Sequence, residues 1–186
     1  SKNRNYDRIT NDFYDDLDAE YITLGGKNGI LFSSNRSNDT IIEMKFDTIL
    51  PLEKFDIFFL EDGSKKLTKI TNTAHTNERY PYILSDENIL CTADIGGIIN
   101  SNIVNFKTKF SYSVSNLDRN LISHHAVKSS QKYVTTYYKD GLYKLFIETL
   151  NPNKSIKPGV TQAGRAIGTL PDLLKVKEMP IELPVE

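Results

Sequence analysis

The chain lacks residues and segments on which several classes of protein depend. None of its 186 residues is tryptophan, and because Cys91 is the single cysteine, no internal disulfide can form. Cys91 lies in the apolar run NILCTAD, where a free cysteine usually packs as a small hydrophobic side chain. No apolar run approaches the roughly 18 residues of a membrane-spanning helix, and the N-terminal SKNRNYDRIT has no apolar signal core. Direct insertion into a membrane is therefore not expected.

The charge balance argues against a nucleic-acid partner. The 23 basic and 24 acidic residues give a formal net charge of -1, so the chain has no overall positive field of the kind that attracts phosphate backbones. Hydrophobic residues make up 39% of the chain and charged residues 25%, which is typical of an ordinary globular protein.

Short β-rich runs separated by polar turns occupy residues 19–150, after a polar lead-in at residues 1–18. Val, Ile, Thr, Tyr and Phe dominate these runs, whereas Gly, Asn, Asp and Ser fill the gaps. The runs are EYITL, GILFSS, KFDIFFLE, PYILS, NILCTA, SNIVNF, FSYSVS, HHAVKS, YVTTYY and LYKLFIE. No stretch of this region has a helical period, so the pattern predicts an all-β fold of antiparallel sheets.

The runs repeat as three units. Each unit has a middle strand (GILFSSNR, NILCTADI or YVTTYYKD), with one strand before it and one after it. The strands that follow begin at Phe55, Asn100 and Leu142, so they are 45 and 42 residues apart. A period of about 40–45 residues with three or four strands is that of a β-propeller blade. The first two middle strands begin at Gly29 and Asn88, 59 residues apart, and this longer interval predicts an insertion over residues 37–54.

These units resemble the TolB-like, or WD40-like, β-propeller repeats over residues 19–150. Such blades contain a Pro-bearing strand, a Ser-Pro-Asp-Gly turn, an Asp-Ile-Tyr-like strand and a closing Leu-Thr. The matching positions here are Asp56, Ile57, Leu67, Thr68, Pro81, Ser85 and Asp86, although no unit has the complete Ser-Pro-Asp-Gly turn. The resemblance implies a bacterial cell-envelope protein, periplasmic or associated with the outer membrane.

The number of blades raises a question about the ends of the array. The sequence supplies three blades and residues for part of a fourth, whereas propellers usually have four to eight. The apolar end faces are therefore expected to be covered by missing blades of a longer chain or by other protein subunits. Residues 151–186 contain Pro and Gly and are expected to be a linker or a tail, an irregular extension with a short helix over residues 170–178 capped by Thr169.

The sequence offers few residues for catalysis or metal binding. His124 and His125 are adjacent in a strand and so point to opposite faces, which prevents joint chelation of one ion. The acidic run DDLD lacks the glycine and distant glutamate of a calcium loop, so Asp15, Asp16 and Asp18 are expected in a solvated loop. There is no G-x-S-x-G motif, and GGKNG is expected to be a hairpin turn. No metal, cofactor or enzymatic activity is predicted.

The remaining candidates are contacts with other molecules. Arg36 is expected to pair with Asp56, and Arg36, Tyr137, Tyr138 and Tyr143 are candidates for a partner-binding surface. The predicted function is a non-catalytic scaffold for protein–protein interaction. Two alternatives remain: an accessory propeller domain of a peptidase or other hydrolase whose catalytic domain lies elsewhere, and a carbohydrate-binding propeller.

Overall fold

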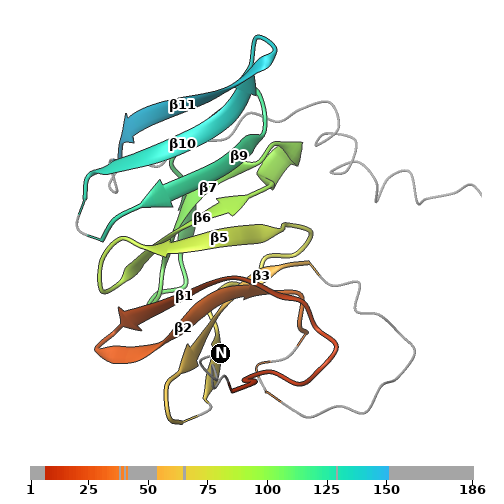
Figure 1. Cartoon of the computed structure of the whole chain (residues 1–186), viewed down its shortest axis with the longest axis vertical. Coiled ribbons are helices and arrows are strands. Elements are labelled where there is room, and N and C mark those ends of the chain that lie inside the picture. The colour runs from red at the N-terminus through yellow and green to blue at the C-terminus, as the bar shows by residue number, and fades with distance from the viewer. Residues whose placement is uncertain are drawn as a thin grey trace, which may run out of the picture.

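The computed structural model describes residues 7–150, apart from residues 38, 40, 42–53, 65 and 129. Within these ranges the chain forms three antiparallel sheets (Figure 1). The first sheet consists, in spatial order, of β1 (Asp16–Leu24), β2 (Lys27–Ser34), β3 (Asp56–Glu61) and β4 (Leu67–Lys69). The second consists of β5 (Glu78–Ile83), β6 (Asn88–Ala93), β7 (Asn100–Asn105) and β8 (Ser111–Ser113). The third consists of β9 (Leu121–Ala126), β10 (Lys132–Lys139) and β11 (Leu142–Thr149).

The all-β prediction is confirmed, and each predicted run overlaps a strand, whereas β4 lies outside those runs. Strand β1 begins at Asp16, inside the predicted lead-in, and one short 3₁₀ turn, η1 (Ile95–Gly97), lies where no helix was predicted. No helix in the described ranges is both long and apolar enough to cross a membrane. Most of the predicted insertion and the whole of residues 151–186 lie outside the described residues.

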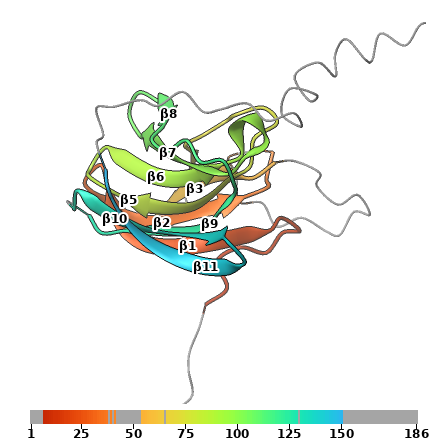
Figure 2. The ribbon, with the colours of Figure 1, turned by 90° about the horizontal axis from the view of Figure 1, so that it is seen from above.

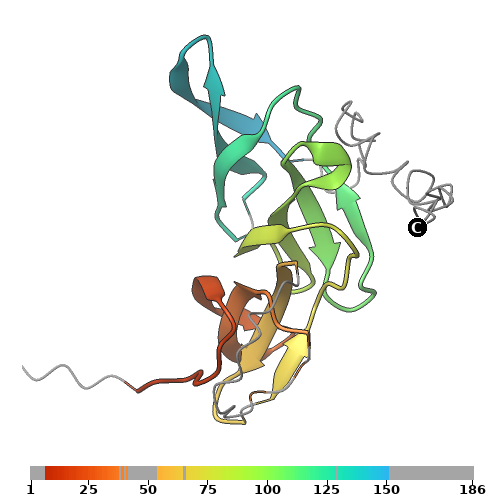
Figure 3. The same cartoon turned by 90° about the vertical axis from the view of Figure 1, so that its right-hand side faces the viewer.

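The sheets stack in chain order. The first strand of each later sheet contacts three strands of the sheet before it: β5 contacts β1, β2 and β3, and β9 contacts β5, β6 and β7. The three sheets follow one another along the long axis of the molecule (Figures 1 and 3) and overlie one another when seen from above (Figure 2). Among the described residues each sheet remains open rather than closing on itself.

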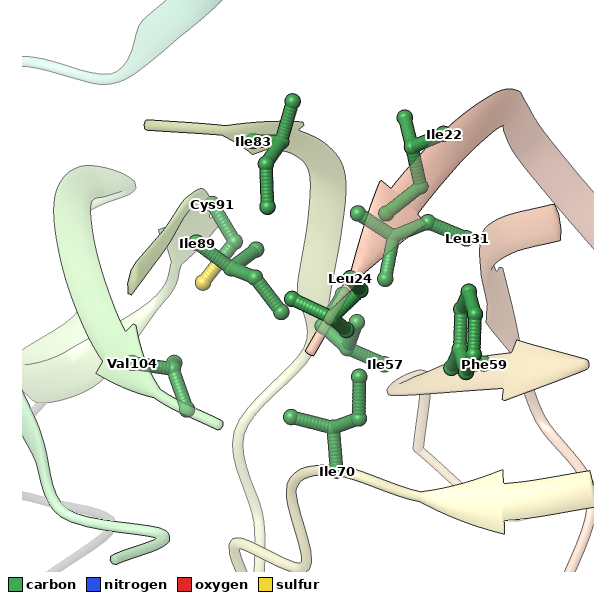
Figure 4. Close-up of a cluster of buried hydrophobic side chains, with 10 residues drawn as sticks. All are labelled: Ile22, Leu24, Leu31, Ile57, Phe59, Ile70, Ile83, Ile89, Cys91 and Val104. Carbon is green, nitrogen blue, oxygen red and sulfur yellow. The ribbon is translucent and has the colours of Figure 1, made fainter. Parts of the chain in front are cut away.

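The first inter-sheet contact explains the apolar run Ile30–Phe32 in the middle of β2. Leu31 packs in a cluster with Ile57 of the same sheet and with Ile89 and Val104 of the second sheet (Figure 4). The next residue, Phe32, points to the opposite face, where it packs against Phe58 in a second cluster. Strand β2 is apolar on both faces because both faces are covered. A strand with one face in water would need apolar side chains on the other face only.

The second inter-sheet contact also contains polar side chains. Leu90 and Ile103 of the second sheet pack with Ala126 and Tyr133 of the third. Buried polar side chains accompany them, among them Ser101, His124 and Thr135. Ser101 hydrogen-bonds to His124, and the Thr135 hydroxyl donates to Glu148 at 2.7 Å, which offsets the cost of removing these side chains from water.

Gly29 provides a test of how tightly β2 and β3 pack. A Cβ atom added at Gly29 would lie 2.2 Å from the Leu60 carbonyl oxygen and 2.7 Å from the Phe59 ring. We expect Gly29→Ala to lower the free energy of unfolding by about 2–3 kcal/mol, because backbone and ring must both shift. Urea unfolding measures the effect, and Asn28→Ala, at the exposed neighbouring position, is the control, expected to cost less than about 1 kcal/mol. Equal effects of the two substitutions would contradict this packing.

Candidate interaction surface

The third sheet leaves one face apolar and uncovered by the described residues. Tyr133 and Ala126 pack against the second sheet. Because side chains alternate along a strand, Val134 and its cross-strand partner Ile147 point the other way. The exposed apolar side chains on this side, which we call the open face, are Val134, Tyr138, Tyr143, Leu145 and Ile147.

The corresponding positions of the other two sheets are buried. In each sheet we compare one residue of the second strand and its cross-strand partner in the third strand. Both lie on the face that points in the direction from the first sheet to the third. These pairs are Leu31 with Phe59, Leu90 with Ile103, and Val134 with Ile147. The first two pairs are at most 3% exposed because the next sheet covers them, whereas Ile147 is 74% exposed. The next pair on the same face, Thr136 with Leu145, leaves Leu145 75% exposed. Within residues 7–150, as far as the structure describes them, the open face is therefore a stacking face without a following sheet.

The predicted tyrosines divide between the two faces of the third sheet. Tyr138 and Tyr143 are exposed on the open face, where their rings meet edge to face at 5.2 Å. Tyr137 lies on the inner face, half-buried, and stacks on Phe146 at 4.2 Å between ring centroids. Sequence reasoning missed Leu145 and Ile147, although the alternation in LYKLFIE places them on the same side as Tyr143.

Arg36 lies at the other end of the stack and is not part of a surface. Its side chain is 0% exposed, and its Nη2 donates to both oxygens of Asp16 at 2.7 and 2.8 Å, while Nη1 lies 3.3 Å from Asp12. The guanidinium also lies within 6 Å of the ring centroids of three aromatic residues, Tyr14, Phe32 and Phe58. Asp56, its expected partner, instead pairs with Lys69 at 2.8 Å. Arg36 thus fastens the N-terminal segment onto the far face of the first sheet.

Two members of the acidic run, Asp16 and Asp18, lie in β1 and are structural rather than part of a solvated loop, whereas Asp15 precedes β1 and is exposed as expected. Asp16 holds Arg36, and Asp18 accepts hydrogen bonds from Arg79 Nε at 2.6 Å and from the Tyr80 amide at 3.1 Å. Burial opposes ionisation of Asp18, but these hydrogen bonds and the Arg79 charge outweigh it and lower the pKa of the Asp18 carboxyl. The Asp18–Arg79 pair links β1 to β5 and was not predicted, because nothing local joins residues 61 positions apart.

A hollow of about 540 Å³ lies beside this ion pair, lined by Phe55, Asn77, Arg79, Asp94 and Asn120, among others. Its charged groups already have partners in the protein. Asp18 neutralises Arg79, and the Asp94 carboxylate accepts from the amide and the side chain of Asn77 at 2.7 and 2.9 Å. Arg79 is thus neutralised by Asp18, and the Asp94 carboxylate is hydrogen-bonded to Asn77 within the protein.

The two histidines occupy opposite faces, as predicted. His124 is buried, its Nε2 lies 2.8 Å from the Tyr80 carbonyl oxygen, and burial lowers the pKa of its imidazole to about 4. The neutral ring donates from Nε2 to that carbonyl and accepts at Nδ1 from the Ser101 hydroxyl. His125 is exposed. No group of three His, Cys, Asp or Glu side chains suited to a metal ion occurs within the described ranges.

Glu78 is a buried acid between the first two sheets. It is 1% exposed, its Oε1 accepts from the Thr73 hydroxyl at 3.1 Å, and its Oε2 has no hydrogen-bond partner among the described residues. Burial, together with the nearby Asp56 charge, raises the pKa of the Glu78 carboxyl to about 7. The folded protein therefore favours the protonated form of the Glu78 carboxyl over the charged form.

Comparison with known proteins adds no identification: no protein-family model matches the chain, and no curated protein matches it significantly in sequence.

The Arg36 cluster predicts a large stability loss on substitution. Arg36→Met leaves the carboxylates of Asp12 and Asp16 without this guanidinium partner, so we expect the free energy of unfolding to fall by about 3–5 kcal/mol. Lys107→Met, which breaks the exposed ion pair with Glu87, is the control and should cost less than about 1 kcal/mol. Equal losses measured by urea unfolding would show that burial of the Arg36 pairs does not stabilise the first sheet.

Glu78 predicts a specific pH dependence. The pKa of the Glu78 carboxyl in the folded protein lies above the ordinary 4.5. The contribution of Glu78 to the free energy of unfolding is therefore complete below about pH 4.5 and is lost as pH rises to about 7. At pH 8 we expect Glu78→Gln to be more stable than the wild type by up to about 3 kcal/mol, with little difference at pH 4.5. His124 acts in the opposite direction below pH 6.5, but it is present in both proteins and cancels in their difference.

Urea unfolding of both proteins at several pH values measures this difference, with Glu87→Gln, at an exposed acid, as the control. A difference between Glu78→Gln and the wild type that does not change with pH would refute the buried-acid assignment.

Proposed function

We propose that this chain is a non-catalytic scaffold, built from blades of the β-propeller type, that binds other proteins through the open face of the third sheet. The single observation that carries the proposal is the exposure of Leu145 and Ile147 at positions that the following sheet covers in the other two sheets. Isolated exposed apolar residues are ordinary, but a contiguous apolar sheet face is typical of an interaction site.

The arrangement of the sheets supports the propeller part of the proposal. Each sheet is an antiparallel array whose spatial order follows the chain, and successive sheets meet through their first strands, β1, β5 and β9. These are features of blades placed side by side around an axis. The partner is accordingly a surface able to replace a following blade, contributed by another protein subunit or by a further blade. The proposed location, periplasmic or outer-membrane-associated, rests on the TolB-like resemblance alone.

The two ends of the stack differ, which favours binding of a partner at the third sheet rather than at the first. On the first sheet, Phe32 and Phe58 are at most 3% exposed beneath the Arg36 cluster. On the third sheet, the described part of the open face carries no comparable ion pair; Val134, Leu145 and Ile147 form an apolar area on β10 and β11, bordered on β9 by the exposed His125. This apolar area costs little to desolvate, so a partner gains most by packing there.

A photo-crosslinking experiment tests this function. A photoreactive phenylalanine analogue placed at position 145 should give a discrete crosslinked species heavier than the chain in cells that produce the protein naturally. Adding Ile147→Glu should remove that species, because a charge on the open face opposes apolar packing. The matched control carries the analogue at position 110, which is 65% exposed but lies outside the open face. No crosslinked partner from position 145, or the same partner from both positions, would contradict the proposal.

A further inference from the structure

The hollow beside Arg79 is large enough to hold a small molecule. Its volume of about 540 Å³ lies within the roughly 300–1,000 Å³ of ligand pockets. All three sheets contribute to its walls: Phe55 precedes β3, Arg79 and Tyr80 belong to β5, Asp94 follows β6, and Asn120 precedes β9. The hollow is therefore complete only when the sheets have stacked.

An irregular backbone at Arg79 and Tyr80 brings both side chains to the hollow. Consecutive residues of a regular strand point to opposite faces, but the pairing of β5 with β6 shifts register between Arg79 and Tyr82, and Tyr80 has a φ of 51°. A left-handed backbone is costly for tyrosine. It is held here because the Tyr80 amide donates to Asp18 at 3.1 Å and the Tyr80 carbonyl oxygen lies 2.8 Å from His124 Nε2. Bulges and held backbone strain of this kind are common at binding sites.

Three polar groups of the hollow keep hydrogen-bonding capacity. Arg79 bonds to Asp18 through Nε and Nη2, and its Nη1 has no hydrogen-bond partner among the described residues. The Oδ1 of Asn120 accepts from a backbone amide at 3.0 Å, whereas its Nδ2 has no partner within the same ranges. The two Asp94 oxygens each accept one hydrogen bond from Asn77, and each can accept another. The hollow thus presents two donor groups and one acceptor group.

This mixture of groups favours an uncharged ligand that carries hydroxyl groups. An anion in the hollow would meet the Asp94 carboxylate, and a cation would meet the Arg79 guanidinium. A hydroxyl both donates and accepts, so a ligand with several hydroxyls can bond to all three groups. The rings of Phe55 and Tyr80, whose centroids lie 4.8 and 5.2 Å from the Arg79 guanidinium carbon, add apolar surface. A sugar ring matches this arrangement, because hydroxyls surround its rim and C–H groups form its faces.

We propose that the hollow binds a neutral saccharide. Sugar hydroxyls accept hydrogen bonds from Arg79 Nη1 and Asn120 Nδ2 and donate to the Asp94 carboxylate, while a sugar ring packs against Tyr80. No side chain of the open face lines the hollow, so this function is separate from the binding of protein partners and does not depend on it.

An array of immobilised neutral, acidic and amino oligosaccharides, probed with the purified full chain, tests the proposal. We expect binding to neutral saccharides. Tyr80→Asn should weaken the dissociation constant for the bound saccharide about tenfold, because it removes the ring. The urea midpoint should stay the same, since asparagine tolerates a left-handed backbone. Tyr143→Asn, on the open face, is the control and should leave saccharide binding unchanged.

A second variant separates the polar contacts from the ring. Asn120→Ala removes the Nδ2 donor and should weaken binding about fivefold. Asn28→Ala is the matched control: Asn28 is also exposed and its Oδ1 also accepts one internal hydrogen bond, from Thr23, but it lies outside the hollow. The control should bind the saccharide as tightly as the wild type.

Three results would overturn the saccharide site. The first is binding of acidic or amino saccharides alone, which would contradict the choice of an uncharged ligand. The second is a neutral saccharide bound equally well by the wild type, Tyr80→Asn and Asn120→Ala, because its site would then lie elsewhere. The third is no binding to any saccharide on the array. A partner still crosslinked from position 145 in cells would leave the proposed scaffold function standing in all three cases.

Discussion

The structure depends on the packing of one apolar sheet face against the next. An apolar sheet face must be covered by another part of the structure, and here the first two sheets place apolar side chains on both faces. Leu31 and Phe32, adjacent in β2, are both buried because each face of the first sheet is covered. The same requirement applies to the third sheet, where the described residues cover Tyr133 but leave Val134 exposed. The proposed function follows from that unmet requirement.

Polar interactions join parts of this stack, but apolar packing is its main source of stability. The Asp18–Arg79 pair joins two sheets at their first strands, and the Arg36 cluster holds the N-terminal segment over the first sheet. Both use short, well-placed hydrogen bonds, which buried charges require if they are not to destabilise the fold. Glu78 is the opposite case: it is buried without a full set of hydrogen-bond partners, and burial favours its protonated form over the charged form.

Local patterns were sufficient to predict the strands but not the long-range pairs. Alternation and turn residues located the β-hairpins, and GGKNG forms a hairpin turn in which Gly25 and Gly26 adopt positive φ. Alternation also separates Tyr138 from Tyr137, a distinction that treating all three tyrosines as one set had overlooked. Arg36 was assigned to the wrong partner because its carboxylates lie about twenty residues before it, in a segment that seemed polar and unstructured. Such pairings depend on how sheets meet, which sequence spacing does not specify.

The central claim is that the open face is a contact surface in the working protein. Methyl NMR of the complete protein, in its native assembly state, tests this claim most directly through Leu145 and Ile147. The account predicts nuclear Overhauser contacts from these methyl groups to residues outside the three sheets, and protection from a soluble paramagnetic agent comparable to that of Leu90 and Ile103. Methyl groups of Leu145 and Ile147 that contact only their own sheet and relax as strongly as fully solvated side chains would contradict it.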